Sequence, residues 1–337
     1  MGRLIFFCKT LDLDFCLGNM NIKFAIQRAA QFLLVIVASS FLISVLIKLM
    51  PFDLADVVAP FGGPEEKAEI SRQLGLDKNV FLQFWSWANR FVRGDLGIIY
   101  SSSETETVSS RLIRALPKSL FLMVYTQIFA LAISIPLAVA CAHKEGSRFD
   151  KIINNSLFTL AAIPGFSIAL ILSFFLGLKL NLLPPLGYVS PSENLLEHIK
   201  LMVLPVLSLS IGLIATYARL LRNDLIASLK DDYVLMAWSK GLSPRTIMWK
   251  HVFRPSSMTL ITSAALNMGG LIGGTVVIEN IFAIPGVGSE IVYAIYSSQI
   301  FMLQSIVAAI SVFYVGINFI ADLLGTKIDP RTRDRRA

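Results

Sequence analysis

The sequence predicts an all-α integral membrane protein with six transmembrane helices. Of its 337 residues, 55% are hydrophobic and 16% are charged, whereas charged residues make up about 25% of an ordinary soluble domain. Long apolar runs separate the charges, and no run alternates with the period of two that a β-barrel wall requires. Since helices satisfy their own backbone groups in lipid, the composition excludes a soluble or disordered chain and favours a helical bundle.

Six runs contain no Asp, Glu, Lys, Arg or His and can cross ~30 Å of hydrocarbon, which takes about 20 helical residues. The shortest has Lys200 and Arg219 at its ends, and their long side chains can reach the two interfaces. In the last run, Tyr293 and Tyr296 are typical of an interface, so we place its crossing part at residues 302–324. The six runs are residues 29–47, 119–142, 152–178, 201–218, 255–278 and 291–321.

The distribution of Lys and Arg predicts the orientation, because short cytoplasmic loops carry an excess of both. Residues 1–28 carry four, 141–151 three, 219–254 seven and the tail 325–337 five, whereas 279–301 carry none. Residues 51–118 carry eight, but the rule weakens in loops longer than about 60 residues. We expect both termini in the cytoplasm, a first helix at 29–50, an extracytoplasmic loop at 51–118 and a five-helix core at 119–324. The net charge of +7 then reflects topology rather than nucleic-acid binding.

The cysteines and histidines predict neither a metal site nor a disulfide framework. Cys8, Cys16 and Cys141 lack metal-like spacing, and the three histidines lie in different connections. Residues 1–19 do not resemble a signal peptide, since no small-residue cleavage site follows an apolar core. A basic amphipathic entry to the first helix follows Met20, and we expect translation to start there.

The extracytoplasmic loop contains one amphipathic helix. Phe81, Phe84, Trp85, Trp87 and Phe91 have the spacing of a helix that lies on the protein or on the membrane interface. The turn sequence Gly-Asp-Leu-Gly at 94–97 ends it. A subdomain that caps the bundle is the favoured interpretation, and a docking surface for an outer partner is the alternative.

The cytoplasmic segment 219–254 predicts two short helices around a sharp turn. The first, residues 231–240, carries Tyr233, Met236, Ala237 and Lys240 on one face. Gly241 ends it as a glycine in the left-handed region would. A second helix follows over 246–253, after Ser243 as N-cap and a proline at the first position. A rigid docking element is favoured over a solvated linker, because a linker needs no caps on both sides of one glycine.

Several motifs in this segment and elsewhere carry a resemblance to one family. Asp232-Tyr-Val and Ala237-Trp-Ser-Lys-Gly-Leu-Ser resemble the EAA loop of binding-protein-dependent ABC importer permeases, in the form of the oligopeptide, dipeptide and nickel branch. Of the general Glu-Ala-Ala opening only Ala237 is kept. Further matches occur in the family's order: Leu-Gly-Leu-Asp at 74–77, Gly-Asp-Leu-Gly at 94–97, Arg-Ala-Leu-Pro at 114–117, Glu-x-x-Phe-x-x-Pro-Gly-x-Gly at 279–288 and Asp-Pro-Arg at 329–331.

The resemblance implies a B-type permease subunit in the bacterial plasma membrane, which is the inner membrane of a Gram-negative cell. A second permease would complete the pathway, two ATP-binding subunits would dock on the inner loop, and an extracytoplasmic binding protein would deliver substrate. The chain has no Gly-x-x-x-x-Gly-Lys-Ser/Thr loop, so we expect no ATPase activity and no cofactor or metal of its own. ATP and Mg²⁺ would be bound by the partners. The residues implied to couple to the ATPase are Asp232, Tyr233, Ala237, Lys240, Gly241, Leu242 and Ser243.

Few residues of the spans stand out. Gly269, Gly270, Gly273 and Gly274 put small residues on adjacent turns, which predicts close helix packing near the pathway rather than substrate contact. Pro-Gly at 164–165 predicts a kink in the third span. Glu279, just outside the fifth span, is expected to brace the outer gate.

The substrate stays open. Peptides are the default, and nickel or another small solute is the alternative within the same family. An ion-coupled transporter is disfavoured, because the six runs hold no ionisable residue. A membrane-embedded hydrolase is disfavoured because no His-Glu-x-x-His or Gly-x-Ser-x-Gly motif occurs.

Overall fold

The computed structural model describes residues 22–49, 63–74, 79–99 and 106–328. The expected start at Met20, most of the motif at 74–77, the motif at 329–331 and most of the basic tail lie outside the described residues. Within them the chain is a helical bundle with one short hairpin, in which β1 (Ile98–Ile99) pairs antiparallel with β2 (Glu106–Thr107).

The elements that follow the hairpin include all the long helices but one. Two π-helical stretches continue α-helices: η1 (Ser173–Lys179) follows α9, and η2 (Ile247–Val252) precedes α13. The α-helices are α3 (Ile22–Leu49), α5 (Pro64–Leu74), α6 (Val80–Val92), α7 (Val108–His143), α8 (Arg148–Ala161), α9 (Gly165–Leu172), α10 (Leu195–Leu229), α11 (Asp232–Ser239), α12 (Pro244–Thr246), α13 (Phe253–Ile281), α14 (Val287–Tyr296) and α15 (Ile300–Ile328).

The helical membrane fold is confirmed, but the count of six spans is not. Among the described residues, four segments are long and apolar enough to cross a bilayer, namely Val108–His143, Leu195–Leu229, Pro244–Ile281 and Ile300–Phe319. The bent pair α8 and α9–η1 makes five if it is one span. The expected first span lies in α3, where the apolar stretch Ala30–Leu46 is shorter.

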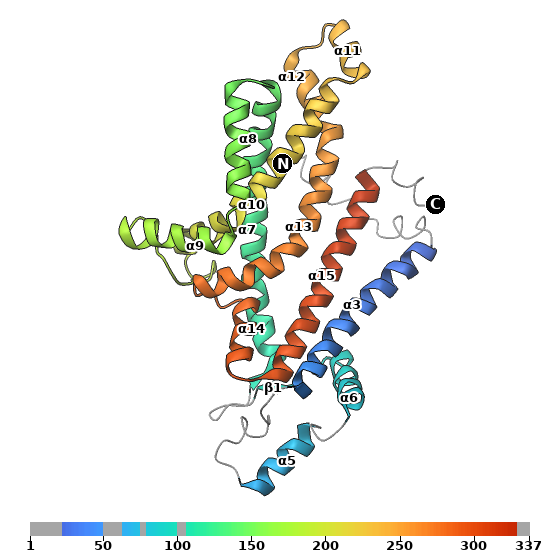
Figure 1. Ribbon diagram of the computed structural model, residues 1–337, viewed down its shortest axis with the longest axis vertical. Coiled ribbons are helices and arrows are strands. Elements are labelled where there is room, and N and C mark those ends of the chain that lie inside the picture. Colours follow the sequence, from blue (N-terminus) through green and yellow to red (C-terminus); the bar gives the residue numbers. More distant parts are fainter. Residues whose placement is uncertain (1–21, 50–62, 75–78, 100–105, 329–337) are drawn as a thin grey trace.

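The third apolar run is bent, as its Pro-Gly pair predicts. The chain turns by 98° between Arg148–Ala161 and Gly165–Lys179. Pro164 stands at the N-cap of α9 with extended backbone, and a proline disfavours helical geometry in the residue before it. Consequently α8 runs along the bundle while α9 projects sideways from it (Figure 1).

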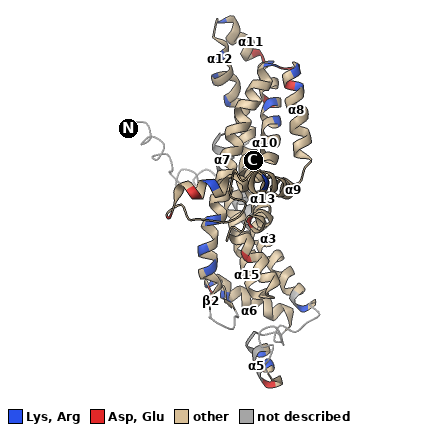
Figure 2. Ribbon diagram, turned by 90° about the vertical axis from the view of Figure 1, so that its left-hand side faces the viewer, with Lys and Arg blue, Asp and Glu red and all other residues tan. Residues whose placement is uncertain are grey.

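The bundle is built around α7, α10 and α13 (Figure 1). Helix α15 packs against α13, and α3 packs against α15. We call the end that carries α11 and the start of α8 the α11 end, and the opposite end, with α14 and the hairpin, the α14 end. Figure 2 shows Lys and Arg residues on α8 and α12 at the α11 end, and a second group near β2. The long helices between the two ends are mostly uncharged.

A buried ion pair fastens α8 to α10 at the α11 end. The Asp150 carboxylate accepts two 2.6 Å hydrogen bonds from the Arg222 guanidinium and one of 3.0 Å from the Gly146 backbone N–H. Ser147 caps α8 by accepting from the Asp150 N–H. Asp150 is only 2% exposed, so its charge depends on this bidentate partner.

We predict that Arg222→Met lowers the free energy of unfolding by about 2–3 kcal/mol, because it leaves a buried carboxylate without its charged donor. The matched control is Lys230→Met, which breaks the exposed pair of Lys230 with Glu145 at 3.0 Å. That change is expected to stay within about 1 kcal/mol. Denaturant or SDS titration in micelles measures both, and equal losses would contradict the prediction.

Candidate functional site

The turn after α11 is a complete helix stop. The Leu242 N–H donates to the Ala237 carbonyl at 3.3 Å, and the Gly241 N–H donates to the Trp238 carbonyl at 2.9 Å. This pair of bonds is the Schellman motif, which requires a left-handed conformation at the residue after the C-cap. Gly241 supplies it with φ of +73°. The glycine stop inferred from the sequence is therefore present with its full hydrogen-bond pattern.

The helix after the turn begins as predicted and then departs from the expectation. Ser243 accepts from the Thr246 N–H at 3.3 Å, and Pro244 occupies the first helical position. The expected helix over 246–253 is not a separate element. Helix α12 continues through η2 into α13, so the turn is joined to the span Pro244–Ile281 without a break.

One edge of α11 is buried in the bundle. Val234 and Ala237 are 0% and 5% exposed, and they belong to an apolar cluster with Leu225, Met248 and Val252. Leu242 packs against the same cluster. The loop is thus fixed to the ends of α10 and α13 by apolar contacts as well as by the chain itself.

The other side of α11 exposes large apolar side chains. Tyr233, Leu235, Met236 and Trp238 are all exposed, as are Asp232 and Lys240. Helical spacing groups Ala237 with Tyr233 and Met236, yet Ala237 lies on the buried edge. We call Tyr233, Leu235, Met236 and Trp238 the α11 apolar face. Within the α11 end it lies among charged residues (Figure 2).

At the α14 end, two side chains from other helices cap the start of α14. The first N–H groups of a helix have no partner within it. Here the Val287 N–H donates to Ser119 Oγ at 2.8 Å, and the Gly288 and Ser289 N–H groups donate to Glu279 Oε2 at 2.7 and 3.2 Å. Ser119 also donates to Glu279 Oε1 at 2.6 Å. A carboxylate at this position also complements the positive end of the helix dipole.

The two glycines of the motif at 279–288 make room for this carboxylate. A Cβ on Gly286 would lie 2.5 Å from the Glu279 carboxyl group, and a Cβ on Gly288 would overlap the backbone of Val276. Glu279 is fully buried at the end of α13. It therefore joins α13, α7 and α14, and the expectation that it braces a gate remains a prediction.

A second contact holds α14 to the start of α7. The Arg111 guanidinium lies 4.2 Å from the centre of the Tyr293 ring, 3.3 Å from Glu290 Oε2 and 3.2 Å from Glu106 Oε2. Burial raises the pKa of Glu290, and the positive charge of Arg111 opposes that rise. These contacts tie the hairpin, α7 and α14 together.

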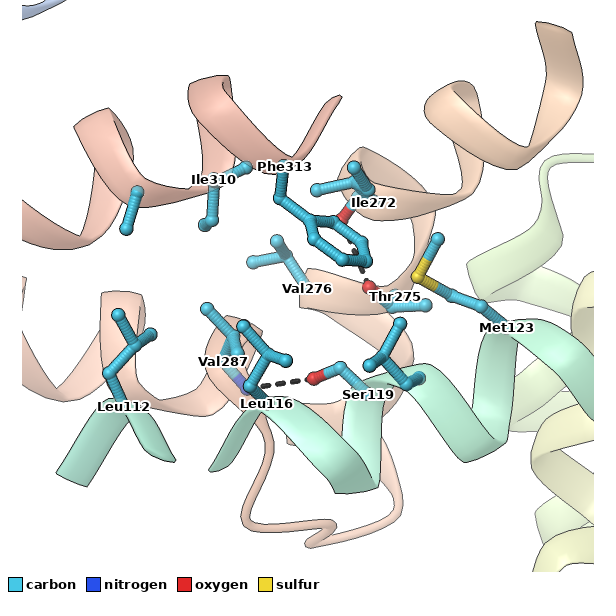
Figure 3. Close-up of a pocket in the computed structure, with 13 residues that line it drawn as sticks. Leu112, Leu116, Ser119, Met123, Ile272, Thr275, Val276, Val287, Ile310 and Phe313 are labelled. Atoms are coloured by element: carbon cyan, nitrogen blue, oxygen red, sulfur yellow. Dashed lines mark hydrogen bonds between the residues drawn. The ribbon is translucent and has the colours of Figure 1, made fainter. Parts of the chain in front are cut away.

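A cavity of about 30 Å³ lies beside the Glu279 cap, between α7, α13, α14 and α15 (Figure 3). Its lining is mainly apolar, including Leu116, Met123 and Phe313. The Thr275 hydroxyl donates to the Ile272 carbonyl, and Ser119 is turned to Glu279 and Val287. Ligand pockets measure about 300–1,000 Å³, so this cavity is a packing gap rather than a transport site.

The four glycines of α13 lie in different surroundings. A Cβ on Gly269 would meet the Tyr314 ring of α15 at 2.5 Å, and one on Gly274 would lie 3.5 Å from Leu209 of α10. Gly270 and Gly273 have nothing within 4 Å and are exposed, as are Leu266 and Val277. The structure thus buries Gly269 against α15 and leaves Gly270 and Gly273 on an open side. Gly274 is exposed and lies within van der Waals reach of α10.

Two important groups were not identified from the sequence. Ser119 was assigned only to the start of an apolar run, because its partner is 160 residues away and no local pattern links them. Asp150 and Arg222 are 72 residues apart. The one local feature that points to either residue is Ser147, a typical N-cap serine three residues before Asp150.

These features define a helical membrane protein whose anchored loop presents an apolar face beyond the lipid-crossing helices. The chain belongs to the binding-protein-dependent transport system inner membrane component family, whose model matches residues 134–334. The model of the N-terminal part of such membrane components matches residues 21–123. It is therefore a permease subunit of an ABC importer in the bacterial inner membrane, a transport component whose family places the ATPase in a separate subunit.

Curated relatives match nearly the whole chain. A probable peptide ABC transporter permease of Sinorhizobium fredii is 30% identical over 92% of this chain and 99% of its own length. The nickel import system permease NikB of Staphylococcus aureus is 32% identical over 93% of this chain and 92% of its own. A chain of the MetNI methionine ABC transporter, solved in an inward-facing conformation, matches with a TM-score of 0.55 and 14% identity. That match covers 65% of this chain and 96% of the other, and it supports the fold.

We predict that Gly288→Ala lowers the free energy of unfolding by about 1–3 kcal/mol, the usual effect of overpacking, because the added methyl group overlaps the Val276 backbone. The matched control is Gly270→Ala, which has open space and gains up to about 1 kcal/mol of helix propensity. Unfolding of the isolated chain in micelles compares the two. Equal stability of the two variants would contradict the packing described for the Glu279 cap.

Proposed function

We propose that this permease transports peptides delivered by an extracytoplasmic binding protein, together with a second permease and two ATP-binding subunits. The peptide assignment is supported by the name of the Sinorhizobium fredii relative. Nickel transport is the second candidate, supported by the NikB relative of similar identity and coverage. Because the binding protein selects the substrate before the permease meets it, the two candidates share the same machinery in this chain.

The α11 apolar face is the observation that supports docking of the ATP-binding subunits on this loop. Its side chains lie at the α11 end, which also carries the Lys and Arg residues of α8 and α12 (Figure 2), and lipid acyl chains do not cover a charged end of this kind. Exposed apolar patches with polar rims mark protein–protein contacts. A protein partner that covers Tyr233, Met236 and Trp238 removes these apolar side chains from water. The coupling residues Asp232, Lys240, Gly241, Leu242 and Ser243 belong to the same element.

The α11 end then faces the cytoplasm, and the α14 end faces outward. The Lys and Arg distribution supports this orientation, in which both termini would lie on the cytoplasmic side. Movement of α11 with the ATPases passes through the Gly241 turn and η2 into α13. A rigid link of this kind converts closure of the ATPase pair into a tilt of the span, which is a two-state rigid-body change. ATP and Mg²⁺ act on the partner side of that contact.

The open side of α13 is the proposed contact with the second permease, near the pathway. Gly270 and Gly273 leave the backbone accessible there, between the exposed side chains of Leu266 and Val277. Small residues let helix backbones approach closely in membranes. This side differs from the one where Gly269 is already covered by Tyr314.

We predict that Gly241→Val abolishes uptake and the ATP hydrolysis that the loaded binding protein stimulates. A branched residue at φ of +73° opposes the turn, since the left-handed region costs an L-residue about 1–2 kcal/mol. Gly241→Asn is the matched control, because asparagine tolerates this region, and it is expected to retain most of the uptake. Normal uptake by Gly241→Val would contradict the proposed rigid link between α11 and α13.

We predict that Met236→Asp releases the ATP-binding subunits on purification without unfolding the bundle, because Met236 is 60% exposed. Asn223→Asp, an exposed position of α10 beyond its apolar run, is the control for added charge and is expected to keep the complex intact. Size-exclusion chromatography of the co-expressed subunits measures the retained ATPase. An intact Met236→Asp complex would exclude this face as the docking surface.

The substrate is tested with the assembled complex in proteoliposomes and its own binding protein. Uptake of labelled di- and oligopeptides that requires ATP is expected. Uptake of ⁶³Ni²⁺ or its chelates without peptide uptake would instead establish the second candidate.

A further inference from the structure

Helix α6 has one side packed on the transmembrane helices. Trp87 is 5% exposed and donates from its indole N–H to Ser305 Oγ of α15 at 3.1 Å. The Phe84 and Phe91 rings lie 5.9 and 5.1 Å from the Trp87 ring. Phe84 also contacts Phe41 of α3 edge-on at 5.4 Å. In Figure 1, α6 lies beside the lower part of α3.

The opposite side of α6 carries large apolar residues that are mostly exposed within the described chain. Phe81, Leu82, Trp85 and Val92 are 68%, 61%, 72% and 85% exposed. With 3.6 residues per turn they fall within a sector of about 100°. We call these four residues the α6 apolar sector. Ser86 and Arg90 are also exposed and occupy the adjacent sector, so the outward side of the helix is divided into an apolar and a polar part. Asn89 is exposed at the edge where Leu82 lies.

The contacts of α6 place it level with apolar stretches of its neighbours. Phe41 lies eight residues before the end of α3, which is about 12 Å along the helix, and Phe81 of the apolar sector contacts it at 5.3 Å. Ser305 lies five residues after the start of α15, or about 8 Å. Both contacts fall inside the apolar stretches Ala30–Leu46 and Ile300–Phe319.

The surface next to α6 is a lipid-facing one. On α3, Leu42 and Leu46 are 59% and 52% exposed at the same level, and they belong to an apolar helix of a multi-pass membrane protein. The α6 apolar sector continues this surface. Tryptophan is enriched where membrane meets water, and a helix with an apolar side and an adjacent polar side with arginine is suited to lie in that plane.

We propose that α6 is a membrane-interface anchor, with Phe81, Leu82, Trp85 and Val92 in the lipid of the leaflet at the α14 end. Ser86 and Arg90 face the headgroups and water. Such an anchor fixes the depth of the segment that precedes the β1–β2 hairpin, since the turn after α6 leads directly into it. The lipid is the occupant, and neither the bundle core nor a soluble partner covers this side.

The two tryptophans of α6 supply an internal comparison. The chain has four tryptophans, and replacing Trp238 and Trp249 by phenylalanine leaves Trp85 and Trp87. Adding Trp87→Phe leaves Trp85 alone, and adding Trp85→Phe leaves Trp87 alone. Each full-length variant is placed in nanodiscs of phosphatidylcholine with or without bromine on the acyl chain near the headgroup. Bromine quenches indole at short range, and aqueous iodide serves as the opposite probe.

The expected result is a several-fold loss of Trp85 emission in bromolipid, with little effect of iodide, and only slight bromolipid quenching of Trp87. Quenching of Trp85 by iodide but not by bromolipid would overturn the proposal, because the sector would face water. Resistance of Trp85 to both probes would also overturn it, because protein would then cover the sector.

A second pair of variants tests the sector without relying on fluorescence. Trp85→Glu places a charge in the apolar sector, and Ser86→Glu places the same charge one residue away in the polar sector. We expect the midpoint of thermal unfolding in nanodiscs to fall for Trp85→Glu and to remain near wild type for Ser86→Glu. Equal midpoints would contradict the proposed orientation of α6.

Discussion

The Glu279 carboxylate is the contact on which the α14 end depends. A helix that starts inside a bundle has N–H groups that water cannot reach, and each one left unpaired destabilises the fold. Glu279 and Ser119 supply acceptors for three of them. Because these acceptors come from α13 and α7, the start of α14 can form only when all three helices are in place. The glycines at 286 and 288 follow from the same requirement, since side chains there would displace the carboxylate.

Helix α13 connects this cap to the other end of the molecule. Its last turn carries Glu279, and its first turn continues from η2 and the Gly241 turn. The segment Pro244–Ile281 is one run of helix. The loop that contains α11 and the Glu279 cap of α14 are therefore fixed to the two ends of the same helix. The Schellman bonds at Gly241 and the apolar cluster around Val234 prevent the loop from moving independently. A displacement of α11 is therefore transmitted directly to α13.

Local patterns in the sequence were enough to predict α6, α11 and the long apolar helices, and contacts between residues distant in the chain could not be predicted from them. The Pro-Gly pair predicted the break before α9, Gly241 predicted the stop after α11, and aromatic spacing predicted α6, because each effect acts within one or two turns. The Ser119–Glu279 cap and the Asp150–Arg222 pair join residues 160 and 72 positions apart. Their formation depends on how whole helices pack. The size of the 98° bend and the continuity of α12 with α13 likewise arise from packing.

The glycines of α13 illustrate how one motif serves two surroundings. Gly269 admits the Tyr314 ring of α15, so a side chain there competes with packing that the chain already makes. Gly270 is the next residue, about 100° around the helix, and it faces open space. A glycine in an exposed helix position lowers helix propensity by about 1 kcal/mol relative to alanine, and no described residue lies within 4 Å of a Cβ at Gly270 to use the space. For this reason we propose that the Gly270 and Gly273 side contacts the second permease.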